Sequence, residues 1–406
     1  MSTSPSGTDA RQSVAILSSA PVGGAGIAAR RLADALIAHT DLDVDFLDGA
    51  ALGEFLPDDV APKISYSNRI VSDVHFSVEF PGFARGWLVE MLKGYDLVNI
   101  HWASTILSLA EIDAVTRTGQ PVAFTLHDFN YVSGGCHYPG PCERMATGCH
   151  ACPQIDRTLA GLDVPPRLYR IKAGIFAREN VHLTAPSHYV RDRAVASGIV
   201  PEARAHVVRN PYAPLEAPLV RGADAPLRLL LIADYLSERR KNMALALDAL
   251  ALLSRDGAPL VVDLVGHGDS AVRKLLDATG VPYVAHGRIT DHAVITEVYR
   301  GADILLTASS EDNWPNILVE AGVYGGIPVV GPGHGCAEFV EAFGFGEIAA
   351  DYSAKAFAAA IARAIDARTP AAVEAAIAQI REAHDPAAIA GTFAQMFASP
   401  RAVRGV

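Results

Sequence analysis

Charged residues are scarce in this chain, and positive ones are scarcer than negative ones. Only 19% of the 406 residues are charged, and 34 Lys and Arg against 45 Asp and Glu leave a formal net charge of −11. Proteins whose main partner is nucleic acid usually carry a basic stripe, and the sequence has none. Nucleic acid is therefore excluded as the main partner, whereas local Arg and Lys clusters can still bind a phosphate-bearing small molecule.

Long apolar runs are also missing, although half of the residues are apolar. No stretch reaches the roughly 18 uninterrupted apolar residues that a membrane-spanning helix requires. The first residues, MSTSPSGTDARQ, are polar and lack the apolar centre of a secretory signal. We therefore expect a globular, cytoplasmic protein that is long enough for two domains with a hydrophobic core each.

Cysteine is rare as well, with five in the chain, yet four of them fall within residues 133–154. Cys136, Cys142, Cys149 and Cys152 are separated by five, six and two intervening residues. Four thiolates with a closing Cys-x-x-Cys pair form a closed tetrahedral zinc site, which braces a loop without catalysing. We predict structural zinc here, with His137 or His150 able to replace one sulfur. Two disulfides or free thiols are the alternatives.

What the sequence does contain is a regular alternation of short apolar runs and helical patterns. An apolar strand starts at Ser13, and further strands are predicted at 44–48, 97–101, 122–128, 182–187 and 205–210, with helices at 106–116 and 190–197. Residues 51–95 show no clear period and are left unassigned. The alternation predicts an α/β fold with a mostly parallel sheet covered on both faces.

A second series of the same kind follows a segment rich in Pro and Ala. Its strands are predicted at 227–233, 260–266, 283–289, 303–309 and 327–333, with helices at 243–253, 270–279 and 292–300. We therefore predict two doubly wound, Rossmann-like domains at 1–210 and 227–385. A hinge at 211–226 joins them, and a helical tail at 386–406 follows.

Candidate ligand-binding residues follow several of the predicted strands. Gly23, Gly24 and Gly26 lie between the first strand and the first helix, where backbone can approach an anion closely; a tight turn without a ligand explains them equally well. His101 and His127 end consecutive strands, and ligands of open parallel sheets gather beyond such ends. Both imidazoles are therefore candidates, and the alternative is a pair of ordinary hydrogen-bonded histidines.

An acidic pair in the second half is the most informative feature. Asp312 and Glu320 stand eight residues apart, and Pro315 favours a helix that begins between residues 313 and 316. Glu320 then points roughly the same way as Asn316 and Ile317, so its carboxylate and the free amides of the helix start can face one cleft. Amides suit a phosphate and a carboxylate suits ribose hydroxyls. The alternative is a simple N-cap with a solvated glutamate.

A basic triplet, Arg239, Arg240 and Lys241, follows the first strand of the second half. At that position a diphosphate can be held by charge and by the amides of a helix start together. A solvated helix face is the alternative. We favour phosphate binding, because the triplet lies at a strand end in register with the acidic pair.

The run ADILLTASSEDNWPNILVEAGVYGGIPVV at 302–330 resembles the signature of family-four retaining glycosyltransferases, an acid followed by seven residues and a glutamate. Those two positions are Asp312 and Glu320 here. The form E-D-N-x-P-N and the GGCHY and GCxxCP elements of the Cys-rich segment resemble the colanic-acid and exopolysaccharide branch. Two departures are that the first acid is Asp, unless Glu311 takes its role, and that Pro315 removes an amide that glycine would offer.

The resemblance implies a GT-B fold, two Rossmann-like domains facing across a cleft, with a C-terminal helix that crosses back to the first domain. It also implies that His127 approaches the reacting carbon of the donor sugar, that Asp312 holds this sugar and that Glu320 binds the ribose. His101 and Asp128 become candidates for the acceptor side. The rest of the implied donor site comprises Gly24, Arg240, Lys241, Arg288 within a base-binding segment at 286–289, Asn313, Asn316 and Ile317. Glu338 matches a family loop, although capping that loop explains it as well.

The expected activity is retaining transfer of a sugar from a UDP- or GDP-linked donor to a hydroxyl of a saccharide or glycolipid acceptor, in exopolysaccharide or cell-surface glycan synthesis. A lipid-linked acceptor would bring the protein to the inner face of the membrane as a peripheral protein. No catalytic divalent ion is expected, because cationic side chains and helix amides would stabilise the leaving diphosphate. An epimerase or a phosphorylase on the same frame, or a non-catalytic sugar-nucleotide-binding protein, is the alternative.

Overall fold

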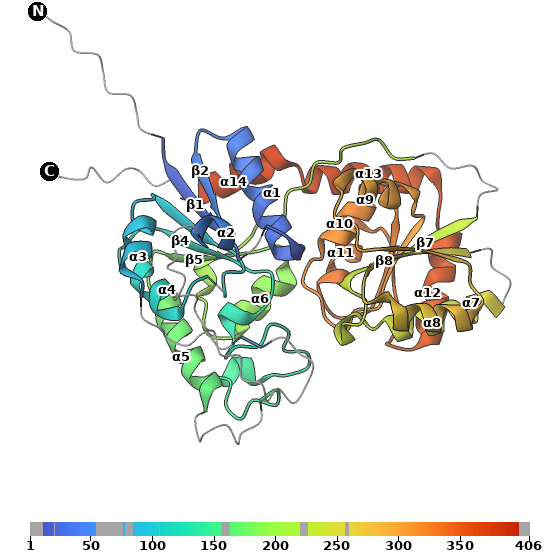
Figure 1. Cartoon of the computed structure of the whole chain (residues 1–406), viewed down its shortest axis with the longest axis horizontal. Coiled ribbons are helices and arrows are strands. Elements are labelled where there is room, and N and C mark those ends of the chain that lie inside the picture. The colour runs from blue at the N-terminus through green and yellow to red at the C-terminus, as the bar shows by residue number, and fades with distance from the viewer. Residues whose placement is uncertain are drawn as a thin grey trace, which may run out of the picture.

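The computed structural model describes residues 11–19, 21–53, 76–77, 84–104, 106–155, 163–219, 226–255 and 260–397. The chain forms two lobes side by side, each built on one six-stranded sheet (Figure 1). All strand pairs within both sheets are parallel. This confirms the α/β prediction of two doubly wound sheets.

The sheet of the first lobe has the order β2-β1-β3-β4-β5-β6. Its strands are β1 (Ser13–Leu17), β2 (Asp43–Leu47), β3 (Leu97–Ile100), β4 (Val122–Thr125), β5 (Val181–Ala185) and β6 (Ala205–Val207). The order reverses between β1 and β3, and ligands of such sheets bind beyond the carboxyl ends at this point. The two candidate histidines follow β3 and β4, next to it.

Helices cover both faces of the first sheet. They are α1 (Gly23–His39), α2 (Gly49–Gly53), α3 (Gly86–Leu92), α4 (Leu109–Thr116), α5 (Val164–Phe176) and α6 (His188–Ala196), with short 3₁₀ turns η1 (Asn130–Val132), η2 (Arg144–Thr147) and η3 (Glu202–Arg204). α2 and α3 fall in the stretch that had no clear period in the sequence. Most of that stretch, 54–75 and 78–83, lies outside the described residues.

The sheet of the second lobe has the order β12-β11-β10-β7-β8-β9. Its strands are β7 (Leu227–Tyr235), β8 (Leu260–His267), β9 (Tyr283–Gly287), β10 (Ile304–Thr307), β11 (Ile327–Val330) and β12 (Glu347–Ile348). This is the strand order of dinucleotide-binding folds, in which the direction of winding changes between the first and fourth strands. Here those strands are β7 and β10, which are the two strands that precede the basic triplet and the acidic pair.

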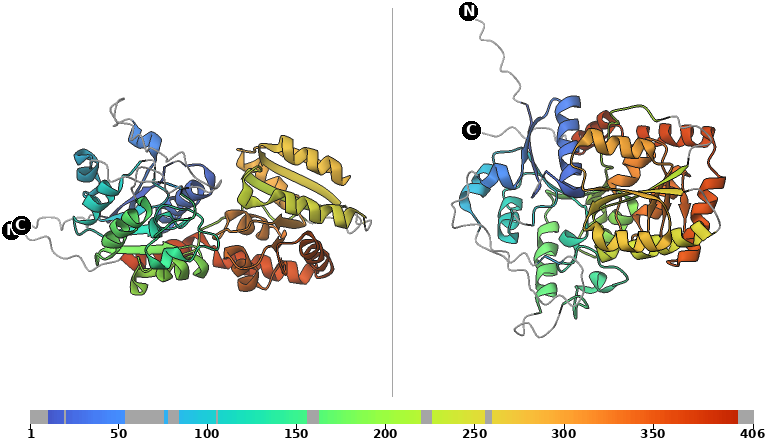
Figure 2. Two further views of the ribbon diagram at one scale, coloured as in Figure 1. Left: turned by 90° about the horizontal axis from the view of Figure 1, so that it is seen from below. Right: turned by 45° about the vertical axis from the view of Figure 1, so that its right-hand side comes forward.

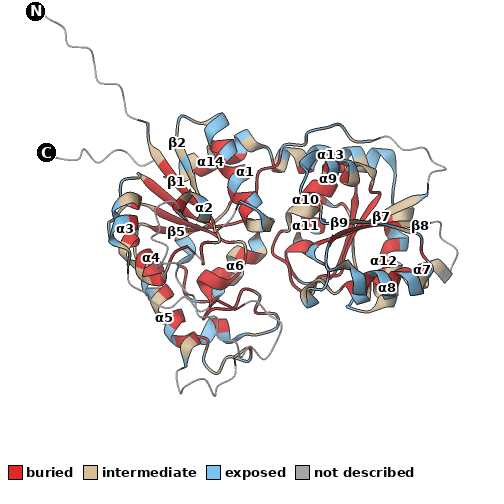
Figure 3. Ribbon diagram, viewed as in Figure 1, coloured by how far each residue is buried: buried red, intermediate tan, exposed pale blue. Residues whose placement is uncertain are grey.

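The helices of the second lobe run between these strands and after the last of them. They are η4 (Arg239–Lys241), α7 (Met243–Arg255), α8 (Asp269–Thr279), α9 (His292–Gly301), α10 (Asn316–Gly322), α11 (Gly335–Phe343), α12 (Ala354–Asp366) and α13 (Pro370–Ala383). Figure 3 shows the central strands of both sheets buried and the outer helix faces exposed, so each lobe has its own core.

The last described helix, α14 (Pro386–Phe397), returns to the first lobe. Ile389, Ala390 and Phe393 of α14 pack with Ala29 and Leu36 of α1 in one apolar cluster. In Figure 2 the red end of the chain lies against the first lobe in both views. The chain therefore passes twice between the lobes, and the two passages meet where the Tyr212 amide donates to the carbonyl of His384 at 2.9 Å. None of the described helices has both the length and the hydropathy needed to span a membrane.

Candidate active site between the two lobes

Two members of the basic triplet, Arg240 and Lys241, contact Asp312 of the acidic pair at the carboxyl ends of β7 and β10. Lys241 Nζ lies 2.7 Å from Asp312 Oδ2, and Arg240 Nη1 lies 3.1 Å from the same oxygen. The amide of Ser310 donates to the carbonyl of Arg240, which ties the two loops together at 2.9 Å. Asn242 ends η4 in the left-handed region, with φ +52°, a conformation that glycine adopts most easily. The sequence therefore brings together the two groups that were predicted to hold a diphosphate and a sugar.

The charges of this cluster are stable at neutral pH. Burial raises the pKa of Asp312, but Lys241 and Arg240 lower it by more, and the net pKa lies well below the usual range. Burial lowers the pKa of Arg240, but Asp312, Tyr138 and Glu238 raise it by more. Two cations thus share one buried carboxylate, while Glu238 pairs with Arg240 at 2.9 Å from its outer side.

The Cys-rich segment of the first lobe reaches this cluster. The ring of Tyr138 lies 3.9 Å from the guanidinium carbon of Arg240, a stacked cation–π contact. The amide of Gly140 donates to Glu311 Oε2 at 2.7 Å. The loop that was predicted only to be braced therefore also covers the cations of the opposite lobe.

The carboxylate of Glu311 faces the first lobe and not Arg240 or Lys241. Arg193 Nη1 lies 3.0 Å from Glu311 Oε1, and the Tyr189 hydroxyl donates to the same oxygen at 3.2 Å. Burial raises the pKa of Glu311, partly offset by the amide of Gly140 and by Arg193. Asp312, and not Glu311, is therefore the acid that contacts the predicted phosphate-binding side chains.

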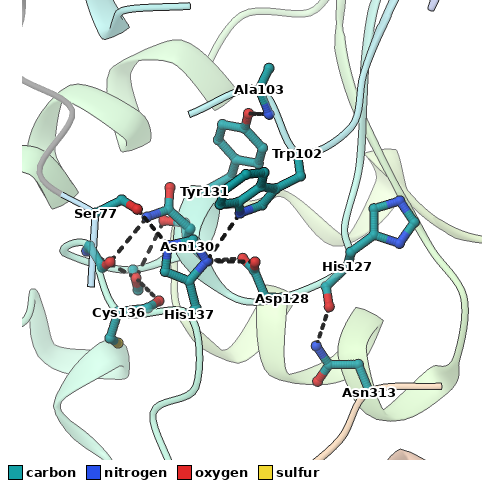
Figure 4. Close-up of polar contacts among 12 residues, drawn as sticks. Ser77, Trp102, Ala103, His127, Asp128, Asn130, Tyr131, Cys136, His137 and Asn313 are labelled. Atoms are coloured by element: carbon teal, nitrogen blue, oxygen red, sulfur yellow. Dashed lines mark hydrogen bonds and ion pairs between the residues drawn. The ribbon is translucent and has the colours of Figure 1, made fainter. Parts of the chain in front are cut away.

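Asn313 links the loop after β10 to the first lobe. Its Nδ2 donates to the backbone carbonyl of His127 at 2.6 Å, as Figure 4 shows, and its own carbonyl accepts from Ser187 Oγ at 2.9 Å. A Cβ at Gly335 would lie 1.6 Å from the carbonyl oxygen of Asn313, so only glycine fits there. The Nδ2 of Asn313 is thus engaged by the first lobe, and its backbone amide donates to Asp312 Oδ1 at 3.2 Å, so the predicted donor contact would require one of these groups to exchange its partner.

Asn316 is the first residue of α10, inside the window predicted for the helix start. Its Nδ2 donates to the carbonyl of Gly24 at 3.0 Å, and its Oδ1 accepts from Asn210 Nδ2 at 2.9 Å. Gly24 is already in the first turn of α1 and not in a preceding loop, because the helix begins at Gly23. The side chain of Ile317 packs against the apolar core of the second lobe. Only its backbone is therefore available for a ligand.

Both oxygens of Glu320 have protein partners. Arg31 Nη2 donates to Oε1 at 2.7 Å from the first lobe, and the Tyr299 hydroxyl donates to Oε2 at 2.6 Å. Burial and the nearby Glu320 together raise the pKa of Tyr299 well above its usual value, so this phenol remains a donor. A ribose at Glu320 would have to share the carboxylate with Arg31 or displace it.

The two strand-end histidines contact each other. His101 Nδ1 lies 2.8 Å from His127 Nε2, and His101 Nε2 lies 2.8 Å from Asn99 Oδ1. Burial and then His127 lower the pKa of His101 far below its usual value. Burial lowers the pKa of His127 to about 4, although Asp128 acts in the opposite direction. Both imidazoles are therefore neutral at pH 7.

Asp128 belongs to a different series of buried hydrogen bonds, which the sequence did not reveal. Its Oδ2 lies 2.6 Å from His137 Nδ1, and His137 Nε2 lies 2.7 Å from Ser77 Oγ (Figure 4). Burial raises the pKa of Asp128, but His137 and the amide of Asn130 lower it by more. All three side chains are almost fully buried, so this series of hydrogen bonds stabilises the turn after β4.

The remaining predicted residues lie at the margins. Arg288 pairs with Asp234 at 3.5 Å at the end of β9. The neighbouring His286 points its Nε2 at Asp263, 2.8 Å away. Glu338 accepts from the amides of His188 and Tyr189, at 2.8 and 2.6 Å, and so caps α6 of the other lobe. Capping across the lobes therefore accounts for Glu338.

The four clustered cysteines do not form a metal site as they lie. Among the described residues, no three His, Cys, Asp or Glu side chains are grouped so that they could hold a metal ion, and each cysteine is outside any disulfide. The thiols are near enough to affect one another, and burial raises the pKa of Cys136 to about 12. Cys149 and Ala151 have φ of +57° and +50°, which turn the chain sharply between the last two thiols. The spacing of the cysteines alone did not predict this turn of the backbone.

Sequence reasoning missed the side chains that join the lobes, chiefly Arg31, Tyr138, Tyr189 and Arg193, and it also missed Tyr299, the partner of Glu320 within the second lobe. Arg31 and Glu320 are 289 positions apart, and Arg193 and Glu311 are 118 apart. The only available signal was the Arg30-Arg31 pair on an otherwise apolar helix pattern.

Solved structures with the same architecture span the whole chain. The crystal structure of Anabaena Alr3699/HepE in complex with UDP matches with a TM-score of 0.65 and 15% identity, over 96% of this chain and 100% of that chain. Sucrose-phosphate synthase from Thermosynechococcus elongatus matches with 0.63 and 18%, over 95% and 98%. WaaG, a glycosyltransferase involved in lipopolysaccharide biosynthesis, matches with 0.59 and 15%, over 96% and 100%.

At these sequence identities, the solved structures establish the fold alone. A sequence model of a protein family also matches part of the chain. No curated protein matches the sequence. The matching family model covers 155 positions, all of them in the second lobe and its last helices. The chain thus has the GT-B fold, and its residues 228–382 match the family described as Glycosyl transferases group 1.

Proposed function

We propose that the protein is a glycosyltransferase that takes its sugar from a nucleotide diphosphate donor bound in the second lobe. The observation that carries the proposal is the buried contact of Arg240 and Lys241 with Asp312, at the point where the strand order of the second sheet reverses. The family match of residues 228–382 covers this lobe. The UDP and UDP-glucose bound to Alr3699/HepE, a protein of the same fold, also support this class of donor.

In this proposal the cation pair binds the diphosphate and Asp312 binds the sugar. When the glycosidic bond breaks, negative charge grows on the leaving diphosphate, and Arg240 and Lys241 stabilise it. The backbone of α10 near Asn316 adds the positive end of a helix dipole. Asp312 exchanges its contact with the cations for hydroxyls of the sugar once the diphosphate has taken its place. No divalent ion is assigned to this step.

The reaction is proposed to retain the configuration of the sugar. In such a reaction the acceptor attacks from the side of the leaving group, and the leaving phosphate takes the proton of the acceptor. His127, neutral and half-buried at the end of β4, would face the donor sugar near the reacting carbon. Its backbone carbonyl already contacts Asn313 of the opposite lobe.

Closure of the lobes belongs to the proposed cycle. Glu311, Glu338 and Asn313 of the second lobe all contact residues 187–193 at the start of α6 in the first lobe. Closed lobes exclude water, and water would otherwise hydrolyse the donor. The donor must enter and the nucleotide must leave through an open state, so these contacts have to break in each cycle.

The acceptor is proposed to be a saccharide or a lipid-linked saccharide in exopolysaccharide or cell-surface glycan synthesis, as in the colanic-acid branch. Peripheral binding at the inner membrane face would follow from a lipid-linked acceptor. Structural zinc at the four clustered cysteines also remains a prediction. The proximity of the four thiols, each of the other three raising the pKa of Cys136, supports it, whereas the absence of a three-ligand group among the described residues does not.

Two neighbouring cations of η4 provide a matched test. Lys241 contacts Asp312, whereas Arg239 is exposed on the same short turn. Lys241→Ala should lower kcat/KM for transfer about 100-fold, the effect of removing one contact to a developing anion. It should also abolish the thermal shift produced by UDP or GDP. Arg239→Ala should change neither by more than about 3-fold, because a solvated charge contributes little.

Equal kcat/KM for the two variants would refute the assignment of the diphosphate site. Conversion of the donor without any acceptor would point to an epimerase. A requirement for inorganic phosphate would point to a phosphorylase. Binding of nucleotide with no turnover on any acceptor would leave a sugar-nucleotide-binding protein.

A further inference from the structure

A buried chain of hydrogen bonds leads from the core of the first lobe to His127. It starts at Thr184 on β5, passes through Thr125 on β4 and Asn99 on β3, and ends at His101 and His127. The links measure 2.7 Å between the two threonine hydroxyls, 2.9 Å from Asn99 Nδ2 to Thr125 Oγ1, and 2.8 Å for each of the two remaining links. Asn99 is fully buried and His101 nearly so.

The direction of the bonds between Thr125, Asn99, His101 and His127 follows from one backbone carbonyl. Asn99 Nδ2 lies 3.1 Å from the carbonyl oxygen of Ala123, which can only accept. The nitrogen of the amide is thereby assigned, and its Oδ1 must face His101 as an acceptor. His101 Nε2 therefore carries the proton, and its Nδ1 is the acceptor for His127.

The same reasoning extends to the last ring. Since His101 is neutral, its Nδ1 has a lone pair, and His127 Nε2 must supply the hydrogen. A neutral His127 with its proton on Nε2 has a lone pair on Nδ1. Among the described residues, no protein group forms a hydrogen bond with that nitrogen. Asp128 raises the pKa of His127, and His127 lowers the pKa of His101.

We propose that Asn99 and His101 are positioning residues, which hold His127 in the tautomer whose Nδ1 accepts a hydrogen bond from a hydroxyl of the donor sugar. The inference rests on the proposed function for the identity of the ligand, but not for the tautomer. An accepting nitrogen selects a donor such as a hydroxyl and rejects a carbonyl or phosphate oxygen. Bonds that all point the same way also strengthen one another, which favours this single arrangement.

The tautomers can be read directly by ¹⁵N NMR of the histidine rings in the intact, wild-type protein at pH 7. Subtraction of the spectra of His127→Gln and His101→Gln assigns the two rings. We expect the proton on Nε2 of both. A proton on Nδ1 of either ring would overturn the inference, whether or not an acceptor for transfer has been found.

A substitution at Asn99 tests the role in turnover. In Asn99→Asp, the new carboxylate stabilises a protonated His101, whose Nδ1 then donates to His127 and moves the proton of His127 to Nδ1. The kcat profile should gain an acidic limb at higher pH than in the wild type, with a loss of about 10-fold below it, the effect of one lost hydrogen bond. An unchanged pH profile in an active Asn99→Asp variant would also overturn the inference.

Thr184→Val is the matched control. It removes a buried hydrogen bond at the inner end of the same chain, without contact to either imidazole. It should lower stability and leave both tautomers and the pH profile unchanged. A shift of the profile in this variant equal to that of Asn99→Asp would show general disruption of the sheet and refute the specific role. Absence of transfer in the wild type with the expected tautomers would count against the proposed function alone.

Discussion

Replacing Asp312 by Asn removes one negative charge from the buried cluster and leaves its volume almost unchanged. The carboxylate is the shared partner of Lys241 and Arg240, at 2.7 and 3.1 Å. In Asp312→Asn both cations remain, and among the described residues Arg240 alone keeps a second carboxylate, that of Glu238. The variant therefore has a buried site with excess positive charge, which favours binding of an anion.

The expected loss of stability follows from the burial of the partners. Removal of one member of a buried ion pair costs about 3 to 5 kcal/mol. The three side chains retain 11 to 15% of their exposure, so we expect the lower figure. For a domain of this size, about 3 kcal/mol corresponds to a decrease in Tm of roughly 6 to 12 °C. The wild type should also lose this contribution progressively as the pH falls below about 4, because the carboxylate of the unfolded chain then takes up a proton while that of the folded chain is still ionised, and the variant should not.

A bound diphosphate should restore the stability that the carboxylate of Asp312 contributed. At 100 times its Kd, a ligand stabilises the folded state by about 2.7 kcal/mol, nearly the whole of the expected loss. Calorimetry with UDP or GDP should therefore show a larger increase in Tm for Asp312→Asn than for the wild type, together with a lower rate of sugar transfer. Asp303→Asn is the control, because Asp303 pairs with Arg368 at 2.6 Å at the opposite end of β10. A diphosphate response of Asp312→Asn no greater than that of Asp303→Asn would refute the reasoning.

Three further changes test other parts of the fold. Burial lowers the pKa of His384 to about 4, so at mildly acidic pH the unfolded chain binds a proton that the folded chain does not. The stability of the wild type should therefore fall by about 2 kcal/mol between pH 7 and 5. In denaturant titrations, His384→Gln should show a smaller dependence of stability on pH. Gly335→Ala should lower Tm and abolish transfer, because its Cβ would lie 1.6 Å from a carbonyl oxygen, whereas Gly391→Ala, in open space on α14, should raise stability by up to about 1 kcal/mol. If the cysteine segment binds zinc, Cys149→Ser with Cys152→Ser should lower metal content and Tm together, and equal zinc by elemental analysis in variant and parent would disprove the site.

The fold was predictable because its cause is local. Each predicted strand is a short apolar run, such as LVVDLV in β8, which is buried from both faces of a parallel sheet. The contact of Lys241 with Asp312 was also predictable, although the two residues are 71 positions apart. Lys241 follows β7 and Asp312 follows β10, the two neighbouring strands between which the direction of winding changes. The topology alone therefore brings the residues after these two strands together.

The partners of Glu320 could not be predicted in the same way. Its position on α10 follows from helical geometry, but Arg31 approaches it from another lobe, and that approach depends on how far the lobes close. Likewise, the spacing of the cysteines is compatible with a zinc site, but it does not reveal the sharp turn that the positive φ of Cys149 and Ala151 gives the backbone between the last two thiols. A linear pattern contains the chemistry of these side chains but not the long-range contacts that orient them.

The position of α14 has a consequence for biosynthesis. Phe393 and its neighbours fill an apolar surface of α1 and β1, which leave the ribosome before the second lobe. That surface stays uncovered while the entire second lobe is translated. We therefore expect the first lobe to reach its full stability only after the second has emerged, and a nascent chain that stops before residue 386 to expose Leu32 and Leu36 to chaperones.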